Sequence, residues 1–114
     1  MSLAEKHCVP CMDSAEEPLD SQSAQRLLAA MSGWHLSEDS KSISREWSFK
    51  NFKYALDFVN EVSVIAEAEN HHPDISFGWG YVRISFTTHS INGLHENDFV
   101  MAAKINLLGQ RETL

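Results

Sequence analysis

Basic residues are scarce in this sequence, and they never occur in a run. Nine lysine and arginine residues stand against 16 aspartate and glutamate residues, so the formal net charge of the 114-residue chain is −7 at pH 7. A protein that binds DNA or RNA directly needs clustered positive charge to displace counterions from the phosphates. The composition therefore argues against direct nucleic-acid binding.

Long apolar stretches are missing as well. No run approaches the roughly 20 apolar residues that a membrane-spanning helix needs. The first residues, Met1 to Lys6, lead into polar sequence and lack the apolar core of a secretory signal. We therefore predict a cytoplasmic protein that does not associate with a membrane.

Cysteine is nearly absent. The two cysteines, Cys8 and Cys11, form one Cys-x-x-Cys pattern. A structural zinc site would need two more ligands, of which His7 supplies at most one. A thioredoxin-like site would need a strand before the pair and a helix after it, whereas the residues that follow are typical of a loop. We expect a pair of reduced thiols on a mobile arm.

The length is enough for one compact domain and too short for two. We predict an irregular N-terminal arm over residues 1–18 and a single domain over 19–114. A chain this short buries a limited core, so pairing with a copy of itself would be a natural supplement.

Hydrophobic periodicity and turn signals predict three helices and four strands. The first helix begins at Leu19-Asp20, with Asp20 as its cap, and ends at Ser32-Gly33. The other predicted elements are strands over 34–36 and 43–49, a helix over 51–70, strands around 75–77 and 81–88, and a helix from His95 to Leu108 that Gly109 stops.

Consecutive strands in this order are joined by short turns, which favours antiparallel pairing. The order is helix, two strands, helix, two strands, helix. We predict an α+β fold in which a four-stranded antiparallel sheet carries three helices on one face.

The apolar arc of the longest predicted helix is wide for a helix that covers a single sheet. The central stripe consists of Phe52, Ala55, Val59, Val62 and Ala66, and Tyr54, Phe58 and Ile65 widen it. We infer that the flank of this helix meets another subunit, although a deeply buried helix in a monomer would give a similar pattern.

The chain's densest chemical feature is a group of histidines. His71 and His72 end the long helix, and His89 follows the last strand. If the last two strands form a hairpin, their far ends come together and bring His89 close to the histidine pair. Histidine exchanges protons near neutral pH, so such a group suits general acid–base chemistry.

These residues resemble the signature of a known family. The run Glu67-x-x-x-His71-His72-Pro73 is followed by Trp79, His89 and Asp98. This pattern resembles that of the pterin-4a-carbinolamine dehydratases, and the resemblance extends over roughly 19–108. The flanking landmarks are Gly33-Trp34, the segment from Arg45 to Phe52, and Gly93-Leu94-His95, where His95 replaces the threonine that caps this helix in many members.

The resemblance implies a 4a-hydroxytetrahydrobiopterin dehydratase that forms a quinonoid dihydropterin and water, without a metal or redox cofactor. It implies catalytic roles for His71, His72 and His89. It places Glu67, Trp34 and Asp98 near the substrate. It also implies a homodimer or homotetramer, and an aromatic amino acid hydroxylase is a compatible partner because it generates the substrate.

Dehydration requires a proton to be delivered to the 4a-hydroxyl group and another to be removed from N5. We expect His72 and His89 to share these roles and His71 to bind or polarise the ring, with exchanged roles left open. Asp98 could instead serve only as a favourable charge at a helix start. We expect Trp79 to pack in the core.

Two other classes of protein remain as alternatives. In the first, His71, His72, His89 and Glu67 bind a metal ion, although adjacent histidines rarely bind one ion together. In the second, the chain is a non-catalytic dimerisation or interaction module. In that case Tyr54, Phe58 and Ile65 of the long helix would contact the partner.

Overall fold

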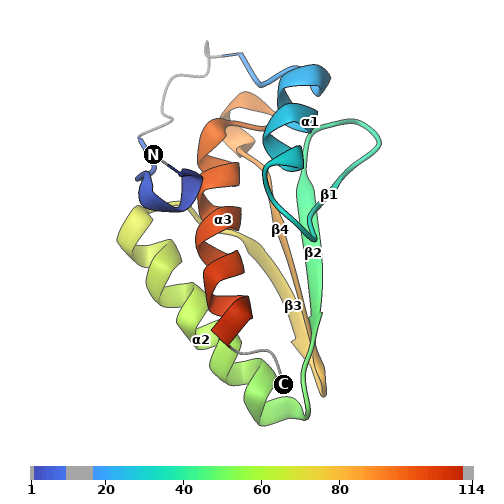
Figure 1. The fold of residues 1–114 in the computed structure, drawn as a ribbon, viewed down its shortest axis with the longest axis vertical. Coiled ribbons are helices and arrows are strands. Elements are labelled where there is room, and N and C mark those ends of the chain that lie inside the picture. Colours follow the sequence, from blue (N-terminus) through green and yellow to red (C-terminus); the bar gives the residue numbers. More distant parts are fainter. Residues whose placement is uncertain (1, 10–16, 112–114) are drawn as a thin grey trace.

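A computed structural model describes residues 2–9 and 17–111 of the protein, with side chains up to residue 108. Its order of helices and strands confirms the prediction (Figure 1). The elements are the 3₁₀ turn η1 (Leu3–Glu5), α1 (Ser21–Ala29), β1 (His35–Leu36), β2 (Ile43–Ser48), α2 (Phe52–Glu69), β3 (Asp74–Gly78), β4 (Tyr81–Phe86), the 3₁₀ turn η2 (His89–Ile91) and α3 (Glu96–Arg111).

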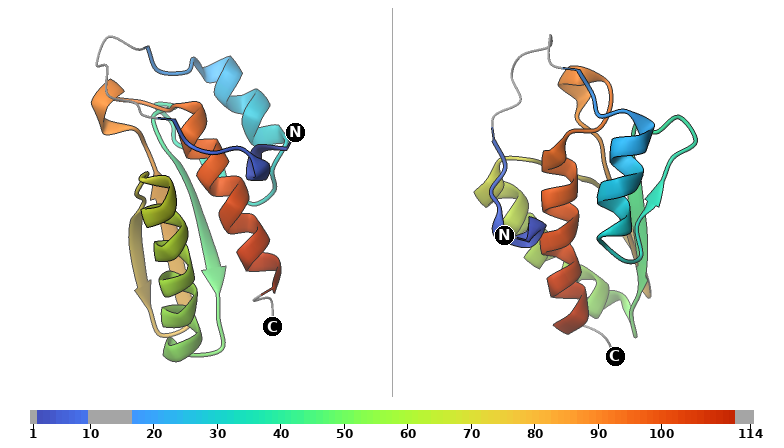
Figure 2. Two further views of the ribbon diagram at one scale, coloured as in Figure 1. Left: turned by 90° about the vertical axis from the view of Figure 1, so that its left-hand side faces the viewer. Right: turned by 45° about the horizontal axis from the view of Figure 1, so that its top comes forward.

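The four strands form one antiparallel sheet in the order β1-β2-β4-β3. Helices α1, α2 and α3 lie on the same side of this sheet (Figures 1 and 2). The predicted α+β fold class is therefore confirmed. The strands alternate as expected, because Val82, Ile84 and Phe86 of β4 are buried against the helices.

Local capping signals begin the first two helices where the sequence places them, but α1 ends at Ala29, before the predicted stop at Ser32-Gly33. The side chain of Asp20 accepts a hydrogen bond from the Ser23 N–H at 2.7 Å, and that of Asn51 accepts one from Tyr54 at 3.0 Å. Helix α2 ends at Asn70, which adopts the left-handed conformation (φ 54°). The chain then leaves the helix just before the histidine pair.

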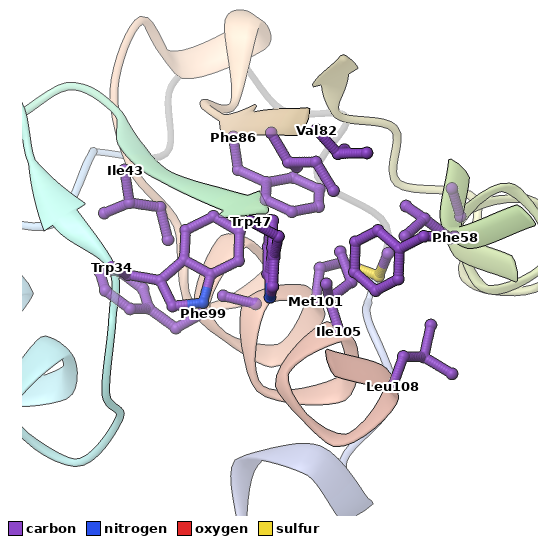
Figure 3. Packing of buried hydrophobic residues seen from close by; sticks show 14 of the residues in the cluster. Trp34, Ile43, Trp47, Phe58, Val82, Phe86, Phe99, Met101, Ile105 and Leu108 are labelled. Atoms are coloured by element: carbon purple, nitrogen blue, oxygen red, sulfur yellow. The ribbon is translucent and has the colours of Figure 1, made fainter. Parts of the chain in front are cut away.

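The buried face of α2 is shifted from the predicted stripe. Phe58, expected on the flank, is fully buried and contacts Trp47 at a ring distance of 5.0 Å (Figure 3). Phe52, expected in the stripe, is 46% exposed. Phe52 differs from the prediction because it lies in the first turn of α2, beside Phe77 of β3, where the core does not enclose its side chain.

Two further expectations are wrong. Trp79 does not pack in the core, because the tight turn between Gly78 and Gly80 leaves its side chain 73% exposed. Gly109 does not stop the last helix, which continues to Arg111. A glycine inside a helix is tolerated at a cost of roughly 1 kcal/mol relative to alanine.

Trp34 is part of a polar network at the edge of the core. Its indole N–H donates to Asn106 Oδ1 at 2.8 Å, and Arg45 donates to the same oxygen at 2.8 Å. The Arg45 guanidinium also packs over Trp47 and covers Gly33, where a Cβ atom would lie 2.5 Å from Arg45 Cζ. The network therefore joins the segment after α1, strand β2 and helix α3.

Within the parts of the chain that the structure describes, no helix combines the length and the apolar character needed to cross a membrane. The cytoplasmic location stays a prediction.

We predict that Asn106→Ala destabilises the protein. The substitution leaves the buried Trp34 N–H without an acceptor, which costs roughly 1–3 kcal/mol. Urea unfolding followed by tryptophan fluorescence measures the change. Lys53→Ala is the control, because the exposed Lys53–Asp57 pair contributes at most about 0.5 kcal/mol. Equal stability of the two variants would contradict this account of the network.

Candidate active site

One end of the sheet opens into a cleft of about 590 Å³. The β3–β4 register, with Asp74 opposite Ser85, brings the segment before β3 and the segment after β4 to this same end. The cleft is lined by Cys8 and Val9 of the N-terminal arm, by residues 69–72 at the end of α2, by residues 87–90 after β4, and by Asn97 of α3. The structure therefore brings His71, His72 and His89 together around one cavity, as the hairpin argument expects.

His71 is held by a buried carboxylate. Its Nε2 lies 2.6 Å from Asp98 Oδ1, and Asp98 is fully buried. The other oxygen, Oδ2, accepts hydrogen bonds from the Thr88 hydroxyl at 2.8 Å and the His95 N–H at 3.0 Å. A carboxylate that accepts all three bonds assigns the ring proton of His71 to Nε2. The Nδ1 atom is then the nitrogen through which His71 can act on a ligand.

Asp98 also begins helix α3. His95 precedes the helix, and its Nδ1 accepts a hydrogen bond from the Asn97 N–H at 2.9 Å. The Asp98 carboxylate in turn accepts a hydrogen bond from the His95 N–H, which is the reciprocal arrangement of a capping box. Asp98 therefore serves the start of the helix and also contacts His71, but it does not line the cleft, so its placement near the substrate stays a prediction.

His72 is paired with Glu67 at the rim of the cleft. Its Nε2 lies 2.6 Å from Glu67 Oε2, and both side chains are more than half exposed. Glu67 itself does not line the cleft. The carboxylate can orient the imidazole, while solvent screens the pair and limits its contribution to stability.

His89 is exposed and begins the 3₁₀ turn after β4. It lines the cleft from the segment after β4, whereas His71 and His72 line the cleft from the segment before β3. The three imidazoles therefore have different surroundings: one is tied to a buried carboxylate, one is paired with a carboxylate at the surface, and one lies exposed in the turn at the cleft.

Trp34 does not line the cleft. It is 5% exposed and lies behind Phe86, whose ring is 5.9 Å from Trp34 and 6.0 Å from His71. Its placement near the substrate stays a prediction, and the contacts of Trp34 support a structural role behind the site.

The arm is the part of the site that sequence reasoning missed. Residues 2–9 are irregular apart from the η1 turn, which lies against α3 (Figure 2). The Glu69 carboxylate accepts bonds from the Cys8 N–H at 2.7 Å and from His7 at 2.8 Å. Of the two cysteines expected to be reduced thiols, Cys8 is free and Cys11 lies outside the described residues. No local pattern could have revealed these contacts, because they join residues about 60 positions apart.

The arm contacts alter two acid groups. The hydrogen bond from the Cys8 N–H, followed by that from His7, lowers the pKa of the Glu69 carboxyl from its ordinary value of 4.5. A lowered folded-state pKa means that this stabilisation is complete above pH 4.5 and is lost as the pH falls below it. Burial raises the pKa of the Cys8 thiol to about 12, and Glu69 acts in the same direction.

Metal binding is not favoured by this geometry. Across the described segments, no three His, Cys, Asp or Glu side chains gather in a way that could hold a metal ion.

Comparison with known proteins agrees with the fold. The sequence profile of the family described as pterin 4 alpha carbinolamine dehydratase matches residues 17–108. A Halorhodospira halophila protein, provisionally named pterin-4-alpha-carbinolamine dehydratase, is 50% identical over 109 residues, which are 96% of this chain and 99% of that protein. The chain belongs to the pterin-4-alpha-carbinolamine dehydratase family.

Solved structures extend the comparison. A transcriptional coactivator/pterin dehydratase from Brucella melitensis aligns with a TM-score of 0.76 at 32% identity, over 81% of this chain and 98% of that one. A pterin dehydratase-like protein, described as a RuBisCO assembly factor in the alpha-carboxysome, aligns with a TM-score of 0.58 at 21% identity, over 67% of this chain and 88% of that one. The second likeness shows the fold alone.

We predict that Cys8 reacts slowly with alkylating agents. Only the thiolate is nucleophilic, and a pKa of about 12 leaves very little of it at pH 8. In a Cys11→Ser variant, iodoacetamide should modify the folded chain at least about tenfold more slowly than the urea-unfolded chain. Mass spectrometry measures the rates. Equal rates in the two states would contradict a buried, neutral thiol.

Proposed function

We propose that this protein is a 4a-hydroxytetrahydropterin dehydratase that works by histidine general acid–base catalysis. The substrate proposed is 4a-hydroxytetrahydrobiopterin or a related pterin, and the products are the quinonoid dihydropterin and water. The activity would return the pterin to tetrahydrobiopterin recycling after an aromatic amino acid hydroxylase has formed the 4a-hydroxy adduct.

The proposed reaction is redox-neutral. The N5 lone pair moves toward C4a as the C4a–O bond breaks, and a general acid protonates the departing hydroxyl group to give water. A general base then removes the N5 proton, which leaves the quinonoid ring. Because no electrons enter or leave, the substrate's own nitrogen and protein acid–base groups are enough, and we propose that no cofactor is used.

The observation that carries this proposal is the meeting of three imidazoles from two separate segments in one cleft. His71 and His72 come from the end of α2, and His89 comes from the turn after β4. The volume of about 590 Å³ falls within the range typical of small-ligand sites. The family membership supports a pterin as the ligand.

The different surroundings of the histidines support a division of roles. The ring of His71 is fixed by Asp98, so it suits binding or polarising the pterin ring. His72 and His89 are exposed and can exchange protons with solvent after each turnover. We propose that these two share the acid and base roles.

We predict that His72→Ala and His89→Ala each lower the catalysed rate by about 10²- to 10⁴-fold, the usual contribution of general acid–base catalysis. A stopped-flow assay on enzymatically generated 4a-hydroxytetrahydropterin measures the ultraviolet change of dehydration. These two histidines are preferred to His71 because removing the His71 ring would also leave the buried Asp98 carboxylate short of a donor.

His35→Ala provides the matched control. This substitution removes an exposed imidazole from β1, outside the cleft, and should leave the rate unchanged. Failure of the unmodified protein to accelerate dehydration would overturn the function. Metal analysis of the same preparation tests the alternative hypothesis of a metal site. Full turnover without bound metal excludes that hypothesis, and stoichiometric zinc lost together with activity favours it.

We further propose that the protein forms a homodimer or homotetramer through α2 and α3. Val64 is 70% exposed and Leu107 is 53% exposed, and both line an apolar groove of about 580 Å³ together with Ile65, Ala68 and Leu108. The alternative function as an interaction module would use the same surface. Phe58 cannot contribute to it because that side chain is fully buried, whereas Tyr54 is 37% exposed.

We predict that the protein sediments as a dimer or tetramer. Val64→Glu should lower the mass of the sedimenting species, because burying a carboxylate in an apolar contact between subunits is unfavourable. Analytical ultracentrifugation measures the mass. Gln25→Glu, an exposed change on α1, is the control and should retain the assembly. A monomeric unmodified protein at micromolar concentration would contradict the proposed assembly.

A further inference from the structure

The N-terminal arm supplies one wall of the histidine cleft. Cys8 and Val9 line the same cavity as His71, His72 and His89, although they lie more than 60 residues away in the sequence. Neither residue belongs to the sheet or to one of its helices. Their presence at the cavity therefore raises the question of what they do there.

Two side chains next to the cleft hold this part of the arm. Asn97 binds the Val9 backbone in both directions: its Oδ1 accepts the Val9 N–H at 3.0 Å, and its Nδ2 donates to the Val9 carbonyl at 2.7 Å. Asn97 is only 4% exposed. Glu69, whose side chain is 10% exposed, accepts the Cys8 N–H. The backbone of residues 8 and 9 is thus bonded to the ends of both helices that border the site.

These contacts are separate from those that dock the rest of the arm. Lys104 donates to the Ala4 carbonyl at 2.8 Å, Lys6 pairs with Glu96 at 3.2 Å, and Leu3 packs against the core cluster. The contacts of Ala4, Lys6 and Leu3 would be enough to attach an arm that served stability alone. The bonds to residues 8 and 9 fix the backbone at the cavity rim, where Cys8 packs against the core cluster and Val9 remains 57% exposed.

We propose that Cys8 and Val9 are substrate-positioning residues, a wall that the folded arm places against a pterin bound in the cleft. The proposal rests on the proposed function. Val9 offers the ring an apolar contact, and the Cys8 thiol is a neutral group that donates weakly to the Asn97 carbonyl at 3.7 Å. A wall without charge suits an uncharged bicyclic ring. The acid–base groups remain on the other segments.

Two variants test the wall in different ways. Val9→Ala shortens the wall while the backbone hydrogen bonds remain. Because the Val9 side chain is 57% exposed, we expect the substitution to change the free energy of unfolding little. Asn97→Asp keeps the shape of the side chain but sets an oxygen against the Val9 carbonyl, which detaches the wall. Lys6→Ala is the control, because it removes an exposed arm contact away from the cleft.

Steady-state and stopped-flow dehydration assays separate KM from kcat. We expect KM to rise by roughly 2- to 5-fold in Val9→Ala and by roughly 3- to 10-fold in Asn97→Asp, as loss of one ligand contact implies. The value of kcat should stay within about twofold, since the histidines are unchanged. Lys6→Ala should alter neither constant. An active protein in which both cleft variants keep the KM of the parent chain overturns the wall and leaves the dehydratase function standing.

A binding measurement decides the matter without turnover. Because ligand and arm are coupled reciprocally, a bound pterin should stabilise the docked arm. We expect 7,8-dihydrobiopterin to slow hydrogen–deuterium exchange in the peptide that contains Cys8 and Val9, and to do so much less in Asn97→Asp. If the protein proves inactive as a dehydratase, slowed exchange still supports the wall. Unchanged exchange at saturating dihydrobiopterin rejects it.

Discussion

The site depends on one buried carboxylate. Asp98 is fully enclosed, and an enclosed charge is tolerated only when hydrogen bonds replace its lost water. It receives them from His71 at the end of α2, Thr88 after β4, and the backbone at His95 before α3. Because the three donors belong to three elements, satisfying this one charge fixes how those elements meet. The cleft is the space that this meeting leaves open, so the stability of the fold and the shape of the site have a common origin.

The hydrophobic core acts on the same histidine from the other side. Trp47 contacts Trp34, Trp34 contacts Phe86, and the Phe86 ring lies nearly parallel to the His71 imidazole, at an angle of 12°. Asp98 sets the direction of the His71 ring, and Phe86 sets its plane. The Asn106 network holds Trp34 at the far end of this row of rings. Residues that never reach the cleft, Trp34 among them, can therefore affect the site by packing.

The sequence could predict those features that depend on residues close together in the chain. Asp20 and Asn51 cap their helices, alternation defines β4, and short turns give antiparallel pairing, so the fold class followed. The spacing of the histidines, with the family resemblance, led to the residues around the cleft. The predictions were wrong or incomplete where contacts between residues far apart in the sequence determine the structure. The shift between Phe52 and Phe58 depends on how far the core extends, and the docking of Cys8 depends on Glu69, far along the chain.

The arrangement of the three imidazoles also bears on how such a cleft could sustain turnover. Dehydration at C4a and N5 uses one donor and one acceptor, and after each cycle both must return to their starting protonation. A ring tied to a buried carboxylate, as His71 is, exchanges protons with solvent less readily than an exposed one. It is better suited to hold the ligand in one orientation. The exposed rings of His72 and His89 border open water, where their protons can be restored without a relay through the core. Under the proposed reaction, the partly buried His71 orients the ligand, and the exposed His72 and His89 transfer the protons.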